Sequence, residues 1–66
     1  MKIFVNGEPA EVNGLTSVAE LATKYGLEPN TVLIEHNQTA LRPREWTDRK
    51  LGEGDRIEFV RVVAGG

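Results

Sequence analysis

The chain has 66 residues, no cysteine, one histidine and a formal net charge of −2, which together describe one small globular domain with a modest apolar core. This composition excludes disulfide bridges and the usual zinc sites, and the interleaved acidic and basic residues argue against a nucleic-acid-binding surface. No segment is long and apolar enough to span a bilayer, and no signal segment precedes the first strand, so we expect a cytoplasmic protein.

The first predicted element is a β-hairpin over residues 1–13. Lys2-Ile3-Phe4-Val5 is a strand-like run, and Asn6-Gly7 is a strong signal for a two-residue hairpin turn because both residues tolerate positive φ. The return strand is expected over Ala10-Glu11-Val12. Pro9 is expected at its entry, because proline has no backbone donor for a strand ladder.

One helix is predicted, from Val18 to Tyr25. Ser17 and Glu20 have the spacing of a capping box, and apolar residues recur behind them at helical spacing. Gly26 supplies a left-handed stop, and Leu27 is the hydrophobic contact that accompanies such a cap. The helix therefore has both a start signal and a stop signal.

A second pair of strands is predicted over Thr31–Glu35 and Thr39–Leu41, joined by a turn at His36-Asn37-Gln38. His36 is the only imidazole, and the chain offers it no cysteine or second histidine as a partner. We interpret it as a surface or turn-stabilising residue rather than a catalytic one.

The remainder of the chain is a loop, a glycine-rich turn and a last strand. In the loop Arg42–Trp46, the tryptophan is a large apolar anchor. The run Leu51–Asp55 is a β-turn rather than a phosphate-binding loop, because neither a Lys-Ser/Thr pair nor a helix follows it. The last strand covers Arg56–Val63, and its alternating Ile57 and Phe59 predict one buried face.

Apolar residues on the other face of this last strand predict a docking surface. Val60 and Val62 share the face of Glu58, away from the predicted core. The chain then ends on Ala64-Gly65-Gly66, which we interpret as a flexible arm with a carboxylate at its tip, thin enough to enter a narrow channel in another protein. A frayed terminus is the alternative interpretation.

The order of elements indicates an α+β fold, in which a single helix covers one face of one mixed sheet built on a ββαββ pattern. Four segments of the sequence carry a resemblance to a known family: Ile3–Glu8, Ser17–Leu21, Pro43–Trp46, and Leu51–Val60 with the closing Ala64-Gly65-Gly66. Together they resemble the ubiquitin-like β-grasp proteins, and more narrowly the ThiS family of sulfur carriers of thiamine biosynthesis. His36 is a departure, because many members have a smaller or apolar residue there.

The resemblance implies that the protein is a carrier and co-substrate rather than an enzyme, with no metal or cofactor of its own. A ubiquitin-activating-like adenylyltransferase of the ThiF type would use ATP to adenylate Gly66. A sulfur donor such as a cysteine desulfurase relay would then convert the adenylate to a thiocarboxylate, and a thiazole synthase of the ThiG type would take up the sulfur. Ala64 and Gly65 would thread the partners' active sites. The docking surface would comprise Val60, Val62, Val63, Leu41 and Trp46.

Three other functions stay open at this point. One alternative is a carrier for molybdopterin synthesis, tRNA thiolation, or cysteine or homocysteine assembly, since these pathways share the terminus and differ in partner surfaces. A protein modifier joined to lysines would use the same activation chemistry. A non-catalytic interaction domain would need no chemistry at Gly66 at all. For each of these we expect residues 1–66 to form a single domain, with a flexible tail over residues 64–66.

Overall fold

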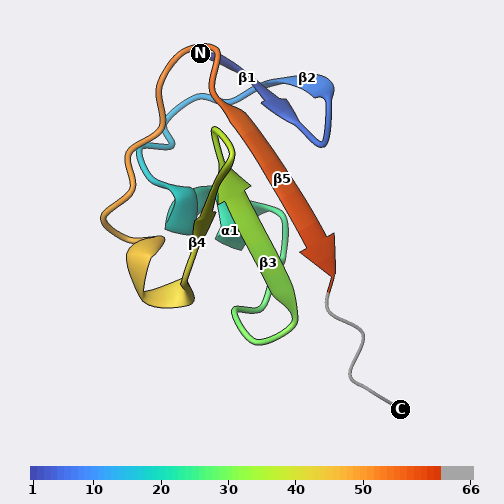
Figure 1. Cartoon of the computed structure of the whole chain (residues 1–66). Coiled ribbons are helices and arrows are strands. Elements are labelled where there is room, and N and C mark those ends of the chain that lie inside the picture. The colour runs from blue at the N-terminus through green and yellow to red at the C-terminus, as the bar shows by residue number, and fades with distance from the viewer. Residues whose placement is uncertain (62–66) are drawn as a thin grey trace.

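The computed structural model describes residues 1–61, which form one five-stranded sheet and one α-helix. The strand order is β2-β1-β5-β3-β4; β1 and β5 are parallel, and the other neighbours are antiparallel. The helix α1 lies behind the sheet in Figure 1, so one face of the sheet is covered and the other is open. The predicted α+β architecture is confirmed. The elements are β1 (Lys2–Val5), β2 (Glu8–Glu11), α1 (Val18–Lys24), β3 (Val32–His36), β4 (Thr39–Leu41), the 3₁₀ helix η1 (Pro43–Glu45) and β5 (Arg56–Arg61).

The first hairpin has the predicted turn but a longer return strand. Asn6 and Gly7 adopt φ values of 52° and 84°, as a two-residue turn of this kind requires. The strand β2 already begins at Glu8, so Pro9 lies inside the strand, opposite Phe4, rather than at its entry. This is tolerated because β2 is an edge strand, and the proline nitrogen needs no partner there.

The helix α1 has both predicted caps. Ser17 Oγ accepts a hydrogen bond from the Glu20 N–H, and Glu20 Oε1 accepts one from the Ser17 N–H. At the other end, the N–H groups of Gly26 and Leu27 bond back to the carbonyls of Thr23 and Ala22, which is the bonding pattern of a Schellman motif. Tyr25 is the C-cap, so the helix ends at Lys24, one residue earlier than predicted.

The second hairpin turns at Asn37 and Gln38, both with positive φ. The strand β4 has the predicted bounds, whereas β3 is shifted by one residue and ends at His36. The placement of His36 in the turn is therefore wrong. The asparagine and glutamine suffice for a two-residue turn, and His36 pairs with Thr39 as the last step of the ladder.

The long loop before β5 packs along the start of α1. The Trp46 and Arg49 carbonyls accept hydrogen bonds from the Ala19 and Val18 N–H groups, which have no partner inside the helix. The predicted anchor role of Trp46 is confirmed, because its side chain is buried in the core. The core lies between α1 and the sheet and comprises Ile3, Val5, Val12, Val18, Leu21, Ala22, Val32, Ile34, Leu41, Trp46 and Ile57.

Candidate docking surface at the end of β5

The candidate site is built around β5, the central strand of the sheet. Ile57 on the helix side is fully buried and Phe59 is partly buried, whereas Glu58 and Val60 face outward. The predicted alternation is therefore confirmed for the described part of the strand. Residues 62–66 follow Arg61 directly in the sequence, so they are joined to the described domain at the end of β5.

An exposed apolar pair stands on the open face beside the end of β5. Val60 is 52% exposed and is paired in register with Leu33 of β3, which is 56% exposed. Leu33 is missing from the predicted docking residues, although a signal for it exists. It alternates with the core residues Val32 and Ile34, so strand periodicity places it on the outer face.

Two of the predicted docking residues are core residues instead. Leu41 and Trp46 are each 4% exposed, and both pack in the cluster beneath the sheet. Leu41 comes from the edge strand β4, whose register with Ile34 turns the leucine toward the helix side. Their predicted contribution to a docking face is therefore wrong, because a partner has no access to these side chains.

The remaining predicted site residues lie outside the described part of the chain. These are the docking residues Val62 and Val63, the threading residues Ala64 and Gly65, and the modified residue Gly66. The structure thus leaves Val60 as an exposed candidate, adds Leu33 as a second one and excludes the buried Leu41 and Trp46.

The end of β5 is fixed by two contacts from other elements. The Phe59 N–H donates to Asn6 Oδ1 at 2.7 Å, which ties β5 to the turn of the first hairpin. The Phe59 ring also meets the Tyr25 ring edge-on, with centroids 5.4 Å apart. Both contacts hold the strand in place just before residues 62–66 begin.

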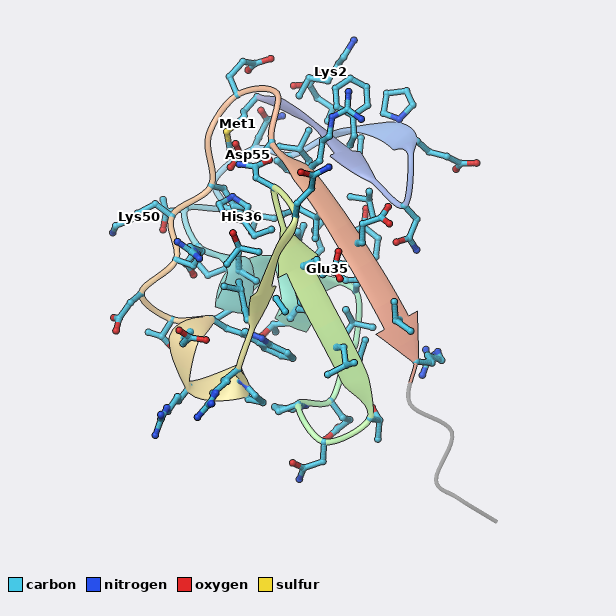
Figure 2. All side chains as sticks on the ribbon, in the orientation of Figure 1. Met1, Lys2, Glu35, His36, Lys50 and Asp55 are labelled. Carbon is cyan, nitrogen blue, oxygen red and sulfur yellow. The ribbon has the colours of Figure 1, made fainter. Side chains whose placement is uncertain are left out.

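His36 is buried and takes part in a network at the other end of β5. Its Nε2 lies 2.7 Å from Asp55 Oδ2, and Figure 2 shows the two residues close together. Asp55 also accepts hydrogen bonds from the Asn37 side chain and the Gly52 N–H. The prediction of a surface histidine is wrong, and that of a turn-stabilising one is confirmed, because His36 holds the turn that leads into β5.

The electrostatics of this network favour an ionised Asp55. Burial alone raises the pKa of the Asp55 carboxyl, but the hydrogen bonds from His36, Asn37 and Gly52 outweigh it and hold the pKa below its ordinary value. The His36–Asp55 pair has the form of a structural brace. It is not part of a metal-ligand cluster, because within residues 1–61 no three His, Cys, Asp or Glu side chains gather as metal ligands would.

Two shallow hollows mark the surface of the described domain. One of about 410 Å³ is lined by Arg44, Glu45, Asp48 and Arg49, all charged. The other, of about 250 Å³, lies between the first hairpin and the end of α1, next to Phe59. In residues 1–61, no helix has the length and apolar character that crossing a membrane requires.

Comparison with known proteins places this geometry in a family. The model of the ThiS family matches residues 3–66. The chain is 34% identical to the sulfur carrier protein ThiS of Thermus thermophilus, over 97% of this chain and 98% of that protein. The crystal structure of a thiamine biosynthesis protein (ThiS) from Geobacter metallireducens covers 100% of both chains, with a TM-score of 0.83 and 30% identity.

A longer protein also contains a region similar to this chain. A thiazole synthase of Magnetococcus marinus is 33% identical over all 66 residues, and the chain spans 20% of the length of that relative. A second thiazole synthase, from Paramagnetospirillum magneticum, is 26% identical over the same share of its length.

Proposed function

The chain belongs to the ThiS family, and on this premise we propose that it is a sulfur carrier of thiamine biosynthesis, with Gly66 as the carrying residue. The observation that carries the proposal is the family match over residues 3–66. The exposed pair of Leu33 and Val60 supports it, because a carrier needs a surface by which enzymes recognise it close to the residues they modify.

The proposed chemistry takes place on the main chain. A carboxylate oxygen of Gly66 attacks the α-phosphorus of ATP in a ThiF-type adenylyltransferase, and pyrophosphate leaves. The terminal sulfur of a persulfide, fed by a cysteine desulfurase relay, then attacks the acyl carbon, and AMP leaves. A thiol reduces the resulting acyl disulfide by cleaving its S–S bond, which leaves a thiocarboxylate on Gly66. ATP activation is needed because a carboxylate oxygen is a poor leaving group.

The domain supplies recognition and the partners supply catalysis. We propose that residues 1–66 act as one cytoplasmic carrier domain, without a bound cofactor and without catalytic residues of its own. Ala64 and Gly65 let the chain enter the partners' active sites, since glycine and alanine occupy little space. Leu33 and Val60 provide the apolar contact, and moderate affinity allows the carrier to leave again.

A thiazole synthase is the proposed acceptor of the sulfur. The similarity of this chain to a region of two thiazole synthases supports this choice over molybdopterin or tRNA thiolation. A carrier-like region within such a synthase has a plain advantage, because it raises the effective concentration of the sulfur donor at the acceptor.

The intact mass of the protein tests this function. The chain is co-expressed with the activating enzyme and sulfur supply of its host, beside a variant that lacks Gly66. We expect a species that is heavier by the difference between sulfur and oxygen, mapped to Gly66 and absent from the variant. An unmodified mass in the presence of an active, ATP-consuming enzyme would leave an interaction domain as the better description.

A further inference from the structure

The edge of β5 that faces β1 is only partly paired. The strand β1 pairs with β5 at two positions, Phe4 with Arg56 and Val5 with Ile57, and the hairpin turn then leads the chain away. The strand β5 continues to Arg61. Over residues 58–61 it therefore has a strand neighbour on the β3 side alone, within the part of the chain described.

The alternation of the ladder shows which backbone groups face this open edge. On the β3 side, the Asn37 N–H bonds to the Arg56 carbonyl, and on the β1 side the Asn6 N–H bonds to the Ile57 carbonyl. Odd-numbered residues of β5 therefore face away from β3. The Phe59 N–H is capped by the Asn6 side chain. The next groups along the edge are the Phe59 carbonyl and the Arg61 N–H, which have no partner among residues 1–61.

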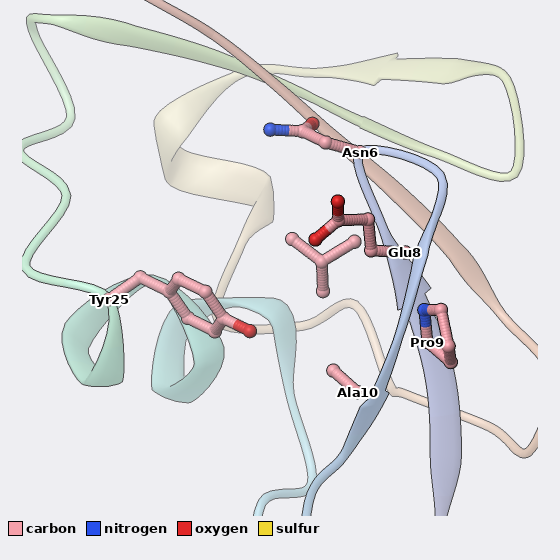
Figure 3. Close-up of a pocket in the computed structure, with 6 residues that line it drawn as sticks. Asn6, Glu8, Pro9, Ala10 and Tyr25 are labelled. Atoms are coloured by element: carbon pink, nitrogen blue, oxygen red, sulfur yellow. The ribbon is translucent and has the colours of Figure 1, made fainter.

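The hollow of about 250 Å³ adjoins this edge. Asn6 both lines the hollow and caps the Phe59 N–H, and the Tyr25 ring in its wall packs against the Phe59 ring. In Figure 3, Tyr25 at the end of α1 and Glu8 of β2 stand on opposite walls. The residues lining the hollow are Val5, Asn6, Glu8, Pro9, Ala10 and Tyr25.

The chemistry of the hollow suits a lysine or arginine side chain. Val5, Pro9 and Ala10 offer apolar surface to its methylene stem. The Tyr25 ring offers an aromatic face to a cation. Glu8 offers the opposite charge, and its carboxylate forms no ion pair within residues 1–61.

We propose that an extended segment of the adenylating partner adds as a strand to β5 at Phe59–Arg61 and places a lysine or arginine between Glu8 and Tyr25. The backbone groups set the register, as in other cases of strand addition, and the hollow selects the side chain. The inference rests on the proposed function, which requires that partner to hold residues 62–66. These five residues span at most about 18 Å when extended. Binding of the partner to β5 would therefore fix the distance between the domain and the partner's active site.

A proline at position 61 tests the strand addition. Arg61→Pro removes the N–H on the open edge, while the bonds of β5 to β3 stay intact because they come from even-numbered residues. Arg61→Ala is the matched control, since it removes the same side chain but keeps the N–H. We expect the proline variant to bind the adenylating enzyme about tenfold more weakly than the alanine variant in calorimetric titration. Circular dichroism verifies that both variants are folded.

A charge variant tests the occupant of the hollow. Glu8→Gln keeps the size of the side chain and removes its charge. We expect it to weaken binding about fivefold at low salt, with a smaller loss at high salt because exposed charges are screened. Asp48→Asn makes the same change of net charge in the other hollow and is expected to bind like the wild-type protein.

The outcomes separate this inference from the proposed function. If wild-type Gly66 never acquires sulfur, the function itself fails. If Gly66 is converted but the proline and alanine variants bind equally, strand addition is refuted, and wild-type affinity of Glu8→Gln refutes the basic side chain. Should Arg61→Pro not fold, hydrogen exchange of the wild-type Arg61 amide decides instead: slower exchange in the complex supports the proposal, and an unchanged rate overturns it.

Discussion

Asp55 shows how one side chain controls the entry of the central strand. Its lowered pKa means that the folded state favours the ionised carboxylate. The stability it contributes is fully present above the pKa of the unfolded chain, about 3.9, and is lost as the pH falls through the lower, folded-state value. The brace between β3 and the turn before β5 should therefore weaken in acid.

Replacement of this carboxylate should change both stability and its pH dependence. Asp55→Asn leaves one oxygen where two now accept bonds from His36, Asn37 and Gly52. We expect a loss of about 2 kcal/mol in the free energy of unfolding at neutral pH. Urea denaturation followed by Trp46 fluorescence checks this. As the pH falls below about 3.9 and through the lower, folded-state pKa, the two curves should converge, and curves that stay parallel would show that Asp55 is not the titrating group.

Residue-scale features were predictable where their partners are close in sequence. The Asn6-Gly7 turn and the Ser17–Glu20 box each lie within four residues, so composition and spacing specify them. The burial of His36 cannot be predicted in this way, because its partner Asp55 lies 19 positions further along the chain. A sequence offers no local sign of such a contact, and a lone histidine next to a turn has the pattern of an exposed residue.

At the scale of the element, α1 depends on its caps because it is only seven residues long. Isolated helices of this length are unstable, so the stability of α1 must come from its caps and from the loop carbonyls that pair with its first N–H groups. Ser17→Ala should lower the free energy of unfolding by about 1 kcal/mol. Urea denaturation measures the loss, and Ser17→Asp, which retains a capping oxygen, should recover most of it. Equal stability of the alanine variant and wild type would contradict the capping role.

A separate prediction concerns the exposed apolar residues of β3 and β5 on the open face of the sheet. Leu33→Lys and Val60→Lys should leave the unfolding midpoint close to wild type, because both side chains are already more than half exposed. Each should raise the KM of the adenylation reaction about tenfold, since a charge replaces an apolar contact. Thr23→Lys on the exposed side of α1 is the control and should not alter KM. An unchanged KM for both strand variants would move the docking surface elsewhere.

Element boundaries and burial were harder to predict than element order. The sequence leaves the burial of Leu41 and Trp46 ambiguous, because apolar residues near a loop fit a docking face as well as a core. Only the register of β4 with β3 and the packing of the loop on α1 resolve this choice. Leu33, in contrast, was recoverable from periodicity alone.

At the scale of the whole molecule, the parallel pairing of β1 and β5 places the start of the chain far from the end of β5. Since the two strands run in the same direction, Met1 lies at the opposite end of the sheet from Arg61 (Figure 1). An N-terminal extension should therefore leave the conversion of Gly66 unimpaired, at the cost of the exposed Met1–Glu11 ion pair. Rates of adenylation with and without a tag measure this, and a large decrease would place a partner contact near Met1.

The same pairing has a consequence for how the protein is made. The strand β1 leaves the ribosome first and β5 last, yet each needs the other in the centre of the sheet. Until β5 emerges, the hairpins on either side have no common partner, and the nascent chain exposes unpaired strand edges that favour aggregation. A polypeptide cut short before Arg56 lacks the central strand, and we expect proteases to degrade it. We therefore expect stable folding only in chains that are synthesised through β5.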